Sequence, residues 1–486
     1  MSHFHIFSCY TRVTAFAQRK CPNPKIAMKK IACLTLCAWF LFVGSLWADY
    51  EYPPALDISI EERTQKQVEE HVEAFERFSL EFYRQLIEDK DTQNKNIVCS
   101  PWSAAIALAM LFEGANSKTA GEIQEALQFQ GDSKEFAKYL FMVAFNTRFS
   151  WGDENRLTLE TANAFCMQAD YKFHDSYKNL LQNRFLAELF TVDFKDHLAD
   201  AVSKINQWCA KNTNDKIKKI VSESDVSSAT RMVLMNAVYF NAKWQDEFDP
   251  KDTKPERFQH ADGSRSRVQM MNMRESSFGY YETRGFKALT MPYTGNAHML
   301  ILLPNRSDGL GNLEKSLTPE VIRQIDKKIF EDDKELYYVN VKIPKFKFEH
   351  TAELNLPLQR MGIEAAFGES ADFSKMTDEE KLFVSRILQK AIIRVDEEGT
   401  EAAAVTAVVM DAMAAWSEEE PKIYTFYADH PFLFLIRENT DGSILFMGRV
   451  HQPEKADGRV GIGFRAGERT PIIERIRNNA GTRSGR

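Results

Sequence analysis

Cysteine is scarce in the body of this chain, which excludes a scaffold held together by disulfides. Four of the seven cysteines lie before residue 49, and only Cys99, Cys166 and Cys209 follow. Three scattered thiols form neither a disulfide framework nor a metal cluster. We therefore expect three small buried side chains and disfavour a catalytic thiol.

Catalytic signatures are also missing. The sequence has no nucleophile elbow, no phosphate-binding glycine loop with lysine, no HExxH and no CxxC, and its histidines show no metal-ligand spacing. Residues 461–466 match a loose dinucleotide fingerprint, but no strand–helix unit of sufficient length surrounds them. We predict no enzyme, no cofactor and no bound metal.

A concentrated basic face is absent as well. The formal net charge is -7, and both the first 48 residues and the stretch after residue 453 are net basic, so the body between them is strongly acidic. Phosphate binding needs clustered positive charge. Nucleic acid is therefore excluded as the main partner.

Residues 1–48 have the pattern of a targeting segment. Lys29 and Lys30 precede an apolar run, 31–48, and Met28 is a candidate start of translation. The small Ala48 fits a secretory signal that is cleaved before Asp49. The run is also long enough to span a bilayer as an uncleaved anchor. We expect a secreted, extracellular protein, or a periplasmic one in a bacterium, with no membrane contact unless the signal stays uncleaved.

The remaining chain reads as one large α+β domain with short additions. We expect a linker at 49–67, the domain at 68–453 and a basic, disordered tail at 454–486. No internal repeat is present in the sequence.

Apolar spacing predicts the main elements of this domain. Steps of three and four residues predict helices at 72–86, 103–112 and 205–220. The nearly continuous apolar run 232–240 predicts a buried central strand, and paired runs predict hairpins at 289–303 and 432–447.

The segment 395–416 is dominated by small residues and has two interpretations. Its alanines favour a helix. Its β-branched residues favour a strand, and a strand would place both of its acids, Glu401 and Asp411, on one face. The other face is uncharged over seven successive positions: Thr400, Ala402, Ala404, Thr406, Val408, Met410 and Ala412. This pattern permits insertion into a sheet.

Four motifs in order resemble the serpin family over essentially all of 68–453. They are residues 96–103 (Asn-Ile-Val-Cys-Ser-Pro-Trp-Ser), 236–244 (Asn-Ala-Val-Tyr-Phe-Asn-Ala-Lys-Trp), the 395–416 segment, and 429–434 with 444–449. The resemblance is to inhibitory members, of the ovalbumin-like or intracellular type, here with a secretion signal. It implies a serpin fold with three β-sheets, about eight or nine helices and an exposed reactive-centre loop.

The resemblance also implies a mechanism. A serine or cysteine endopeptidase attacks the loop and forms a covalent acyl-enzyme, and the cleaved loop then inserts into the main sheet as a new strand. We expect such an inhibitor to act as a monomer. The alternative is a non-inhibitory serpin that acts as a carrier or chaperone.

Site residues follow from the same resemblance. The hinge is expected to comprise Glu397, Glu398, Gly399, Thr400, Glu401, Ala402, Ala403 and Ala404. The shutter and breach, where the sheet parts, are expected to comprise Ser100, Ser103, Asn236, Trp244 and Gln389, the last standing where many members have histidine. As structure alone, the two serines would cap a helix, and Asn236 and Trp244 would serve core packing.

Family counting from Glu397 places the reactive bond at Met413–Ala414, to within one or two residues. These uncharged side chains suit an elastase-like or chymotrypsin-like target. A trypsin-like target is disfavoured, because no Lys or Arg occurs from Val395 to Pro421. Thr400 is expected to be the first side chain that insertion buries.

Overall fold

The structure of the chain is a computed structural model. It describes residues 65–89, 92–131, 133–148, 158–185, 187–331, 337–378, 382–400 and 421–456. All of them belong to one of the two units of the chain, Glu62–Arg486. The predicted signal region, most of the predicted linker and nearly all of the predicted tail lie outside the described residues.

The main sheet has the strand order β11-β12-β4-β2-β3. Its strands are β2 (Thr158–Gln168), β3 (Glu188–Val192), β4 (Met232–Lys243), β11 (Phe346–Glu353) and β12 (Arg386–Val395). The central strand β4 runs antiparallel to β2 and parallel to β12. The strand predicted at 232–240 is confirmed, and its continuous apolar run is explained because both of its faces are buried.

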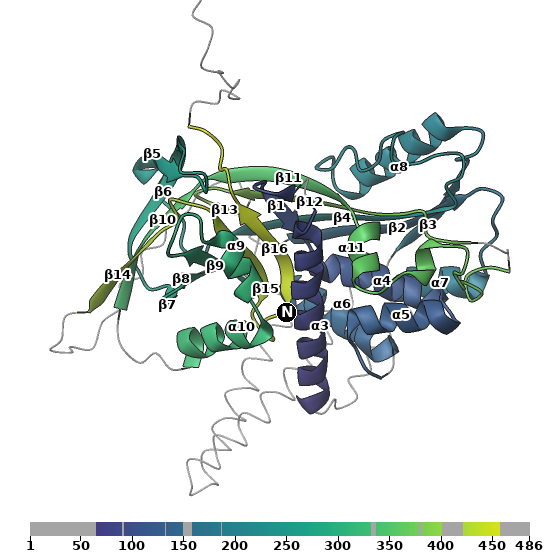
Figure 1. Cartoon of the computed structure of the whole chain (residues 1–486), viewed down its shortest axis with the longest axis horizontal. Helices are drawn as coiled ribbons and strands as arrows, with labels where there is room; N and C mark the ends of the chain where they lie inside the picture. Colours follow the sequence, from purple (N-terminus) through teal and green to yellow (C-terminus); the bar gives the residue numbers. More distant parts are fainter. Residues whose placement is uncertain are drawn as a thin grey trace, which may run out of the picture. The chain divides into compact units, whose positions relative to one another are not determined.

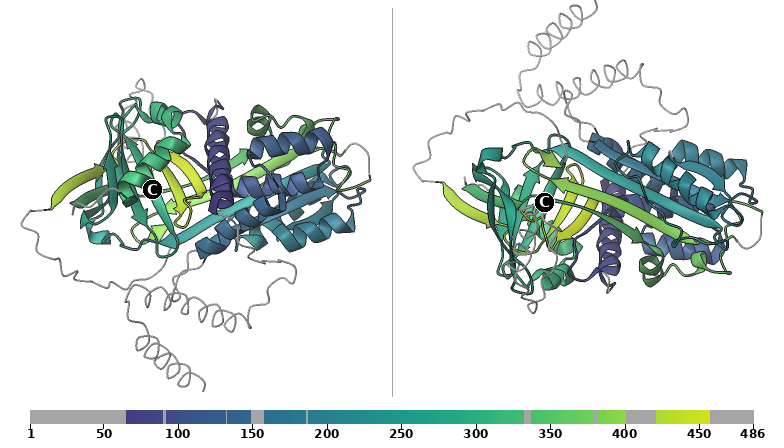
Figure 2. Two further views of the ribbon diagram at one scale, coloured as in Figure 1. Left: turned by 90° about the horizontal axis from the view of Figure 1, so that it is seen from below. Right: turned by 90° about the horizontal axis from the view of Figure 1, so that it is seen from above.

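Helices cover both faces of this sheet. In Figure 1, α8 (Leu198–Asn212) lies on one face, and α4 (Pro101–Gly114), α5 (Ser117–Leu127), α6 (Ser133–Arg148) and α7 (Asp175–Phe185) lie on the other. Seen from above in Figure 2, the strands of the sheet run side by side. The sheet therefore separates two apolar clusters, a small one beneath α8 and a large one that extends through the rest of the domain.

The helix predicted at 205–220 is wrong in both of its bounds. α8 begins earlier, at Leu198, and ends at Asn212. Asn214 and Asp215 have positive φ angles of 47° and 61°, which asparagine and aspartate tolerate but a helix does not. The Thr213 hydroxyl donates to the Cys209 carbonyl over 2.8 Å and accepts from the Ile217 amide over 3.0 Å, so it bridges the helix end and the following turn.

The other two predicted helices are confirmed, although α3 (Gln65–Ile87) begins well before the predicted start at residue 72 and within the predicted linker. It buries Phe75, Phe78 and Phe82 along one stripe. α4 begins two residues before the predicted start, with Pro101 in its first turn and Ser100 as its N-cap. The Ser103 amide donates to the Ser100 hydroxyl over 3.2 Å.

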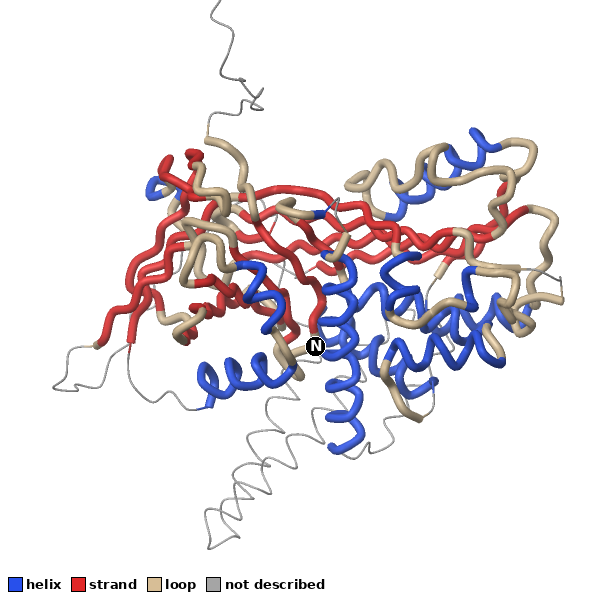
Figure 3. Tube along the Cα trace, in the orientation of Figure 1, coloured by secondary structure: helices blue, strands red, loops and turns tan. Residues whose placement is uncertain are grey.

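Two further sheets complete the described residues. One has the order β1-β16-β15-β9-β8-β7, and the other has the order β14-β10-β6-β5. Both predicted hairpins are confirmed, as β8 with β9 and as β15 with β16. Figures 2 and 3 show these strands on one side of α3 and the helices α4 to α7 on the other. The strand bounds are β1 (Ile97–Cys99), β5 (Lys254–Gln259), β6 (Arg265–Ser276), β7 (Gly279–Glu282), β8 (Phe286–Pro292), β9 (Ala297–Pro304), β10 (Tyr337–Pro344), β14 (Lys422–Tyr427), β15 (Phe432–Glu438) and β16 (Ile444–Val450).

Three sheets and nine α-helices among the described residues give the expected α+β class. The remaining helices are α9 (Leu310–Ser316), α10 (Pro319–Asp326) and α11 (Asn355–Arg360). Within the described ranges, none of the helices combines the length and the apolar character that crossing a bilayer requires.

Candidate functional site

The main sheet holds a short extra strand at the end where β4 and β12 finish. The ladder between β12 and β4 runs from Arg386 opposite Val233 to Ile392 opposite Tyr239. Beyond it, β13 (Gly399–Thr400) pairs antiparallel with β4, with Thr400 opposite Ala242. The chain that leaves β12 therefore turns back and already lies against β4.

Backbone hydrogen bonds fix this turn. The Asp396 amide donates to the Gly399 carbonyl, and the Trp244 amide donates to the Glu398 carbonyl, both over 2.9 Å. The indole N–H of Trp244 donates to the Asp396 carbonyl over 3.0 Å. Gly399 has a φ of +149°, and a Cβ there would collide with the Ala242 carbonyl oxygen. The tight approach to β4 therefore requires glycine.

Thr400 is fully buried in this structure. Its hydroxyl lies 2.9 Å from the hydroxyl of Tyr293, and the Tyr293 ring stacks on Trp244 with ring centroids 4.5 Å apart. Burial raises the pKa of Tyr293, so the phenol stays neutral and can donate. Thr400, the first side chain of the uncharged face, therefore bonds to an aromatic pair formed by Tyr293 and Trp244.

The two hinge glutamates that the structure describes differ in their surroundings. Glu397 is buried, accepts from Lys345 Nζ over 2.6 Å and accepts from the Thr253 hydroxyl over 2.8 Å. Burial opposes ionisation, but these hydrogen bonds outweigh it and hold the pKa of Glu397 below its usual range. Glu398 is half-buried and is held through its backbone. Glu401, Ala402, Ala403, Ala404, Met413 and Ala414 lie outside the described residues.

The predicted shutter residues meet in a buried polar network. Gln389 and Asn236 are opposite each other on β12 and β4, and Gln389 Nε2 donates to Asn236 Oδ1 over 3.1 Å. Gln389 also bonds the backbone of Ser100 in both directions, with distances of 2.9 Å. Asn236 Nδ2 donates to the hydroxyl of Ser103. The network therefore joins β4, β12 and the start of α4 across the line where the two strands meet.

Sequence reasoning missed several members of the site. Asn163, on β2, accepts from Asn236. A polar residue in the middle of a buried strand was the available signal for it. Tyr293 and Lys345 carry no such signal, because each is brought to the hinge from a distant part of the chain.

The thiols offer no alternative chemistry. Cys99, Cys166 and Cys209 are all buried and unpaired, as expected. Burial raises the pKa of each, that of Cys209 to about 12, which leaves little thiolate at neutral pH. No cluster of three or more potential metal ligands exists among the described residues.

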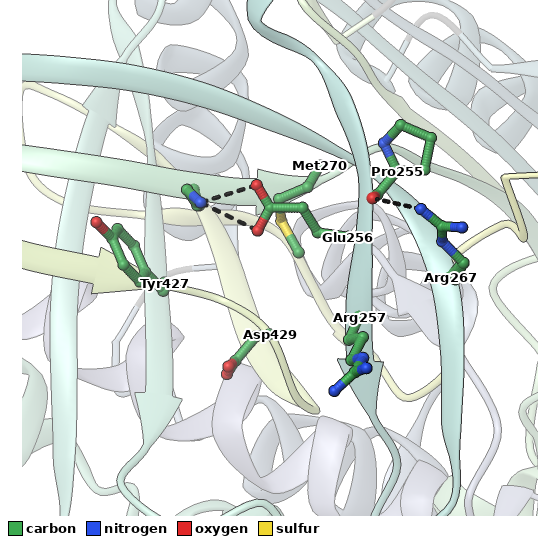
Figure 4. A pocket seen from close by; sticks show the side chains of 8 residues that line it. Pro255, Glu256, Arg257, Arg267, Met270, Tyr427 and Asp429 are labelled. Atoms are coloured by element: carbon green, nitrogen blue, oxygen red, sulfur yellow. Dashed lines mark hydrogen bonds and ion pairs between the residues drawn. The ribbon is translucent and has the colours of Figure 1, made fainter.

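A hollow of about 620 Å³ opens on the sheet of β5, β6, β10 and β14 (Figure 4). Lys342 Nζ pairs with both carboxylate oxygens of Glu256, over 2.8 and 3.0 Å, and lies 5.1 Å from the ring centre of Tyr427. Arg267 donates to the Pro255 carbonyl over 3.3 Å. Lys342 and Glu256 therefore neutralise each other here, whereas Arg257 and Arg267, which also line the hollow, form no ion pair among the described residues.

Comparison with known proteins covers the whole region that contains the hinge and the polar network. Residues 73–453 match the family model described as Serpin (serine protease inhibitor). Leukocyte elastase inhibitor of the pig, Sus scrofa, is 35% identical over 387 residues, which cover 78% of this chain and 98% of that protein.

Solved structures agree. Serpin48 of the insect Tenebrio molitor matches with a TM-score of 0.68 and 32% identity, covering 79% of this chain and 99% of that chain. Human thyroxine-binding globulin, in complex with thyroxine, matches with a TM-score of 0.71 and 27% identity, covering 80% of this chain and all (100%) of that chain. The fold and the sequence therefore point to the same family.

Proposed function

This chain belongs to the serpin family, which is described as a family of serine protease inhibitors, and on that premise we propose that it is a single-use inhibitor of serine or cysteine endopeptidases. The observation that carries the proposal is β13. Gly399 and Thr400 already pair with β4, at the point from which a longer strand would extend.

The register of β13 predicts where such a strand would lie. With Thr400 opposite Ala242, each later residue of the segment meets the preceding residue of β4, so Thr406 would face Asn236. Side chains of even number would point into the large apolar cluster beside Phe240 and Leu234. These are the uncharged positions of the segment, and they suit that face.

Insertion of a new strand would replace one ladder of backbone hydrogen bonds by two. The direct pairing of β12 with β4 would be replaced by pairing of each strand with the new one between them, which adds backbone hydrogen bonds worth about 0.5–1.5 kcal/mol each. The hydrogen bond from Gln389 to Asn236 must break, and the Thr406 hydroxyl is placed to accept and donate in its place. The network therefore selects a small polar side chain at this position.

The covalent step would take place at the predicted reactive bond, Met413–Ala414, which precedes β14 in the sequence. The serine hydroxyl or cysteine thiolate of the protease would attack the Met413 carbonyl carbon, the peptide bond to Ala414 would break, and Ala414 would leave as a protonated amine. The ester or thioester that remains would be carried away from water and catalytic base as the segment inserts. Two observations favour an elastase-like or chymotrypsin-like target: the side chains of Met413 and Ala414 are uncharged, and one relative is named leukocyte elastase inhibitor.

One experiment tests this function. The chain from residue 49 is incubated with elastase, chymotrypsin, cathepsin G and trypsin, and the products are boiled in SDS and separated by electrophoresis. We expect a covalent complex with at least one of the proteases that cleave after uncharged side chains, which are elastase, chymotrypsin and cathepsin G. Clean cleavage by every protease, with no complex and no rise in thermal stability of the cleaved chain, would contradict the proposal.

A carrier role is the second candidate, and one observation favours it. A hollow of about 680 Å³ is lined by Phe278, Ile329, Phe330 and His298, and the buried His298 Nε2 has no hydrogen-bond partner among the described residues. Thyroxine-binding globulin, a structural neighbour, binds a small molecule. A hydrophobic dye that binds in this hollow, together with no covalent complex from any protease, would favour the carrier.

Secretion is part of the proposal. The basic flank and apolar run of residues 28–48 support export with cleavage before Asp49. N-terminal sequencing of the protein from its native source tests this, and a mature chain that still begins at or before Met28 would contradict cleavage.

A further inference from the structure

Two arginines stand opposite each other on neighbouring strands beside the hollow of Figure 4. β5 and β6 form an antiparallel ladder in which Arg257 is the partner of Arg267. Side chains that are directly opposite in such a ladder share a face, with their Cβ atoms about 5 Å apart. Both residues are exposed, and both line the hollow. This edge of the sheet therefore presents two guanidinium groups together.

The charges of the two arginines are not balanced by the described residues, among which neither guanidinium forms an ion pair. The two acids that line the hollow are engaged elsewhere. Glu256 pairs with Lys342 over 2.8 Å, and Asp429 Oδ1 lies 2.7 Å from His430 Nδ1. A carboxylate that arrives from outside would therefore find two cations without a charged partner.

Stability of the fold does not explain this pair of arginines. Like charges directly opposite each other destabilise a strand pair, whereas opposite charges stabilise it. An acid at either position would pair with the arginine that remains, and the same sheet already pairs an acid with a base at Glu256 and Lys342. The chain keeps two cations where one acid would suit the fold better, which points to a partner outside the chain.

A tyrosine lies across the hollow from the two arginines, as Figure 4 shows. Tyr427, on β14, is 41% exposed, and its ring centre lies 5.1 Å from Lys342 Nζ, which limits its movement. Tyrosine and arginine are enriched at the centres of protein–protein interfaces. The hollow of about 620 Å³ thus has the side chains of an interface on two sides.

The hollow lies beside both attachments of the segment 401–420. On one side, the hydroxyl of Thr253, which directly precedes β5, donates to Glu397 of the hinge over 2.8 Å. On the other side, β14 begins at Lys422, just beyond the segment. A protease that attacks the segment is therefore tethered from both ends next to the sheet that carries the arginines.

The size of the charged surface favours a protein partner over a long polyanion. A polyanion would run beyond the two arginines onto a strongly acidic body and be repelled there. A folded protein can present one or two carboxylates and no more. The planar guanidinium group binds such a carboxylate through two parallel hydrogen bonds.

We propose that Arg257 and Arg267, with Tyr427 across the hollow, form a secondary docking site for an acidic surface of the target protease. The inference rests on the proposed inhibitory function and adds a determinant of target choice that is separate from the reactive bond. Among proteases that cleave after uncharged side chains, the site favours those with carboxylates close to their active-site cleft. It acts on the encounter with the protease, before the covalent step.

The rate of inhibition tests the docking site. The full chain is mixed with the protease of the panel that it traps fastest, and the second-order rate constant is measured at low and at high salt. Binding to the serine-to-alanine form of the same protease reports docking without a covalent step. The variants are Arg257→Glu, Arg267→Glu and Tyr427→Ser. The matched control, Arg360→Glu, reverses the charge of an exposed arginine on α11, which contacts α3.

We expect each of the two arginine variants to lower the rate constant and the affinity about tenfold at low salt, with a smaller loss at high salt. Each places an acid opposite the remaining arginine, so the melting temperature should be no lower than that of the parent. The stoichiometry of inhibition should not change. Tyr427→Ser should weaken binding equally at both salt concentrations, and Arg360→Glu should have no effect.

Three outcomes would contradict the proposal. Unchanged rates and affinities in Arg257→Glu and Arg267→Glu, with a covalent complex from the parent, would overturn the docking site and leave the proposed function intact. Weaker retention of these variants on immobilised heparin, with unchanged rates of inhibition, would assign the arginines to a polyanion instead. A parent that forms no covalent complex with any protease would overturn the proposed function and the docking site with it. Because β5 is an edge strand, Arg257→Glu remains decisive if Arg267→Glu loosens β6.

Discussion

Replacing Thr400 by arginine should turn this chain from an inhibitor into a substrate. Thr400 has no exposed surface, and its hydroxyl bonds the buried Tyr293. A guanidinium in this place would have to leave water before any further residue could enter the sheet. An uncompensated buried charge costs about 3–5 kcal/mol. If that cost falls on the transition state, insertion slows by roughly a hundred- to a thousandfold or more.

The assay is the stoichiometry of inhibition. The acyl-enzyme partitions between insertion, which traps the protease, and hydrolysis, which releases it. Titration of a target protease should therefore require many Thr400→Arg molecules per enzyme inactivated, and electrophoresis should show cleaved chain in place of covalent complex. In the uncleaved variant the arginine can stay in water only if β13 leaves β4, so the melting temperature should fall by the loss of this two-residue strand and of the contact with Tyr293, while the ion pair of Glu397 with Lys345 remains.

Glu401→Arg is the matched control. It places the same charge one residue later, on the opposite face of an inserted strand, where glutamate is already tolerated. We expect it to inhibit with nearly the parent stoichiometry. A Thr400→Arg variant that traps protease as efficiently as the parent would refute the argument that this side chain must be buried for the strand to insert.

Three further outcomes are expected. Gly399→Ala should push the hinge away from the Ala242 carbonyl and raise the stoichiometry of inhibition, while the melting temperature of the uncleaved protein changes little. Burial raises the pKa of Glu76 from 4.5 to about 7, so the folded protein should lose stability as the pH rises from about 4.5 to about 7. The variant Glu76→Gln should not show this loss. Its melting temperature should be higher than that of the parent at pH 8 and nearly the same at pH 4. Iodoacetamide mapping by mass spectrometry should leave Cys209 unlabelled in the native protein and label it in urea.

Where burial alone decides structure, the sequence was a good guide to the fold. The apolar run 232–240 became the central strand because both of its faces are covered. The prediction of a helix at 205–220 was wrong because burial continues beyond the end of the helix. Ile217 and Ile220 are buried beneath α8 with the same spacing as helical residues, although the backbone there has left the helix. Apolar periodicity reports which side chains are buried, and it does not report the path of the backbone between them.

The site was partly predictable. Resemblance to the family predicted that Gln389, Asn236 and the two serines act where the sheet parts. The structure shows hydrogen bonds among these residues, and their role in the parting of the sheet stays a prediction. The resemblance gave no sign of Tyr293, which follows a hairpin strand and is recruited by stacking on Trp244. Contacts of this kind depend on how distant segments pack, so residue type and local spacing do not encode them.

The crystal structure of the chain cleaved between residues 412 and 420 tests the central claim most directly. We predict a new strand between β4 and β12, with Thr400 still opposite Ala242 and with Thr406 beside Asn236 and Gln389. A cleaved structure that retains the ladder from Arg386 opposite Val233 to Ile392 opposite Tyr239 would contradict the account.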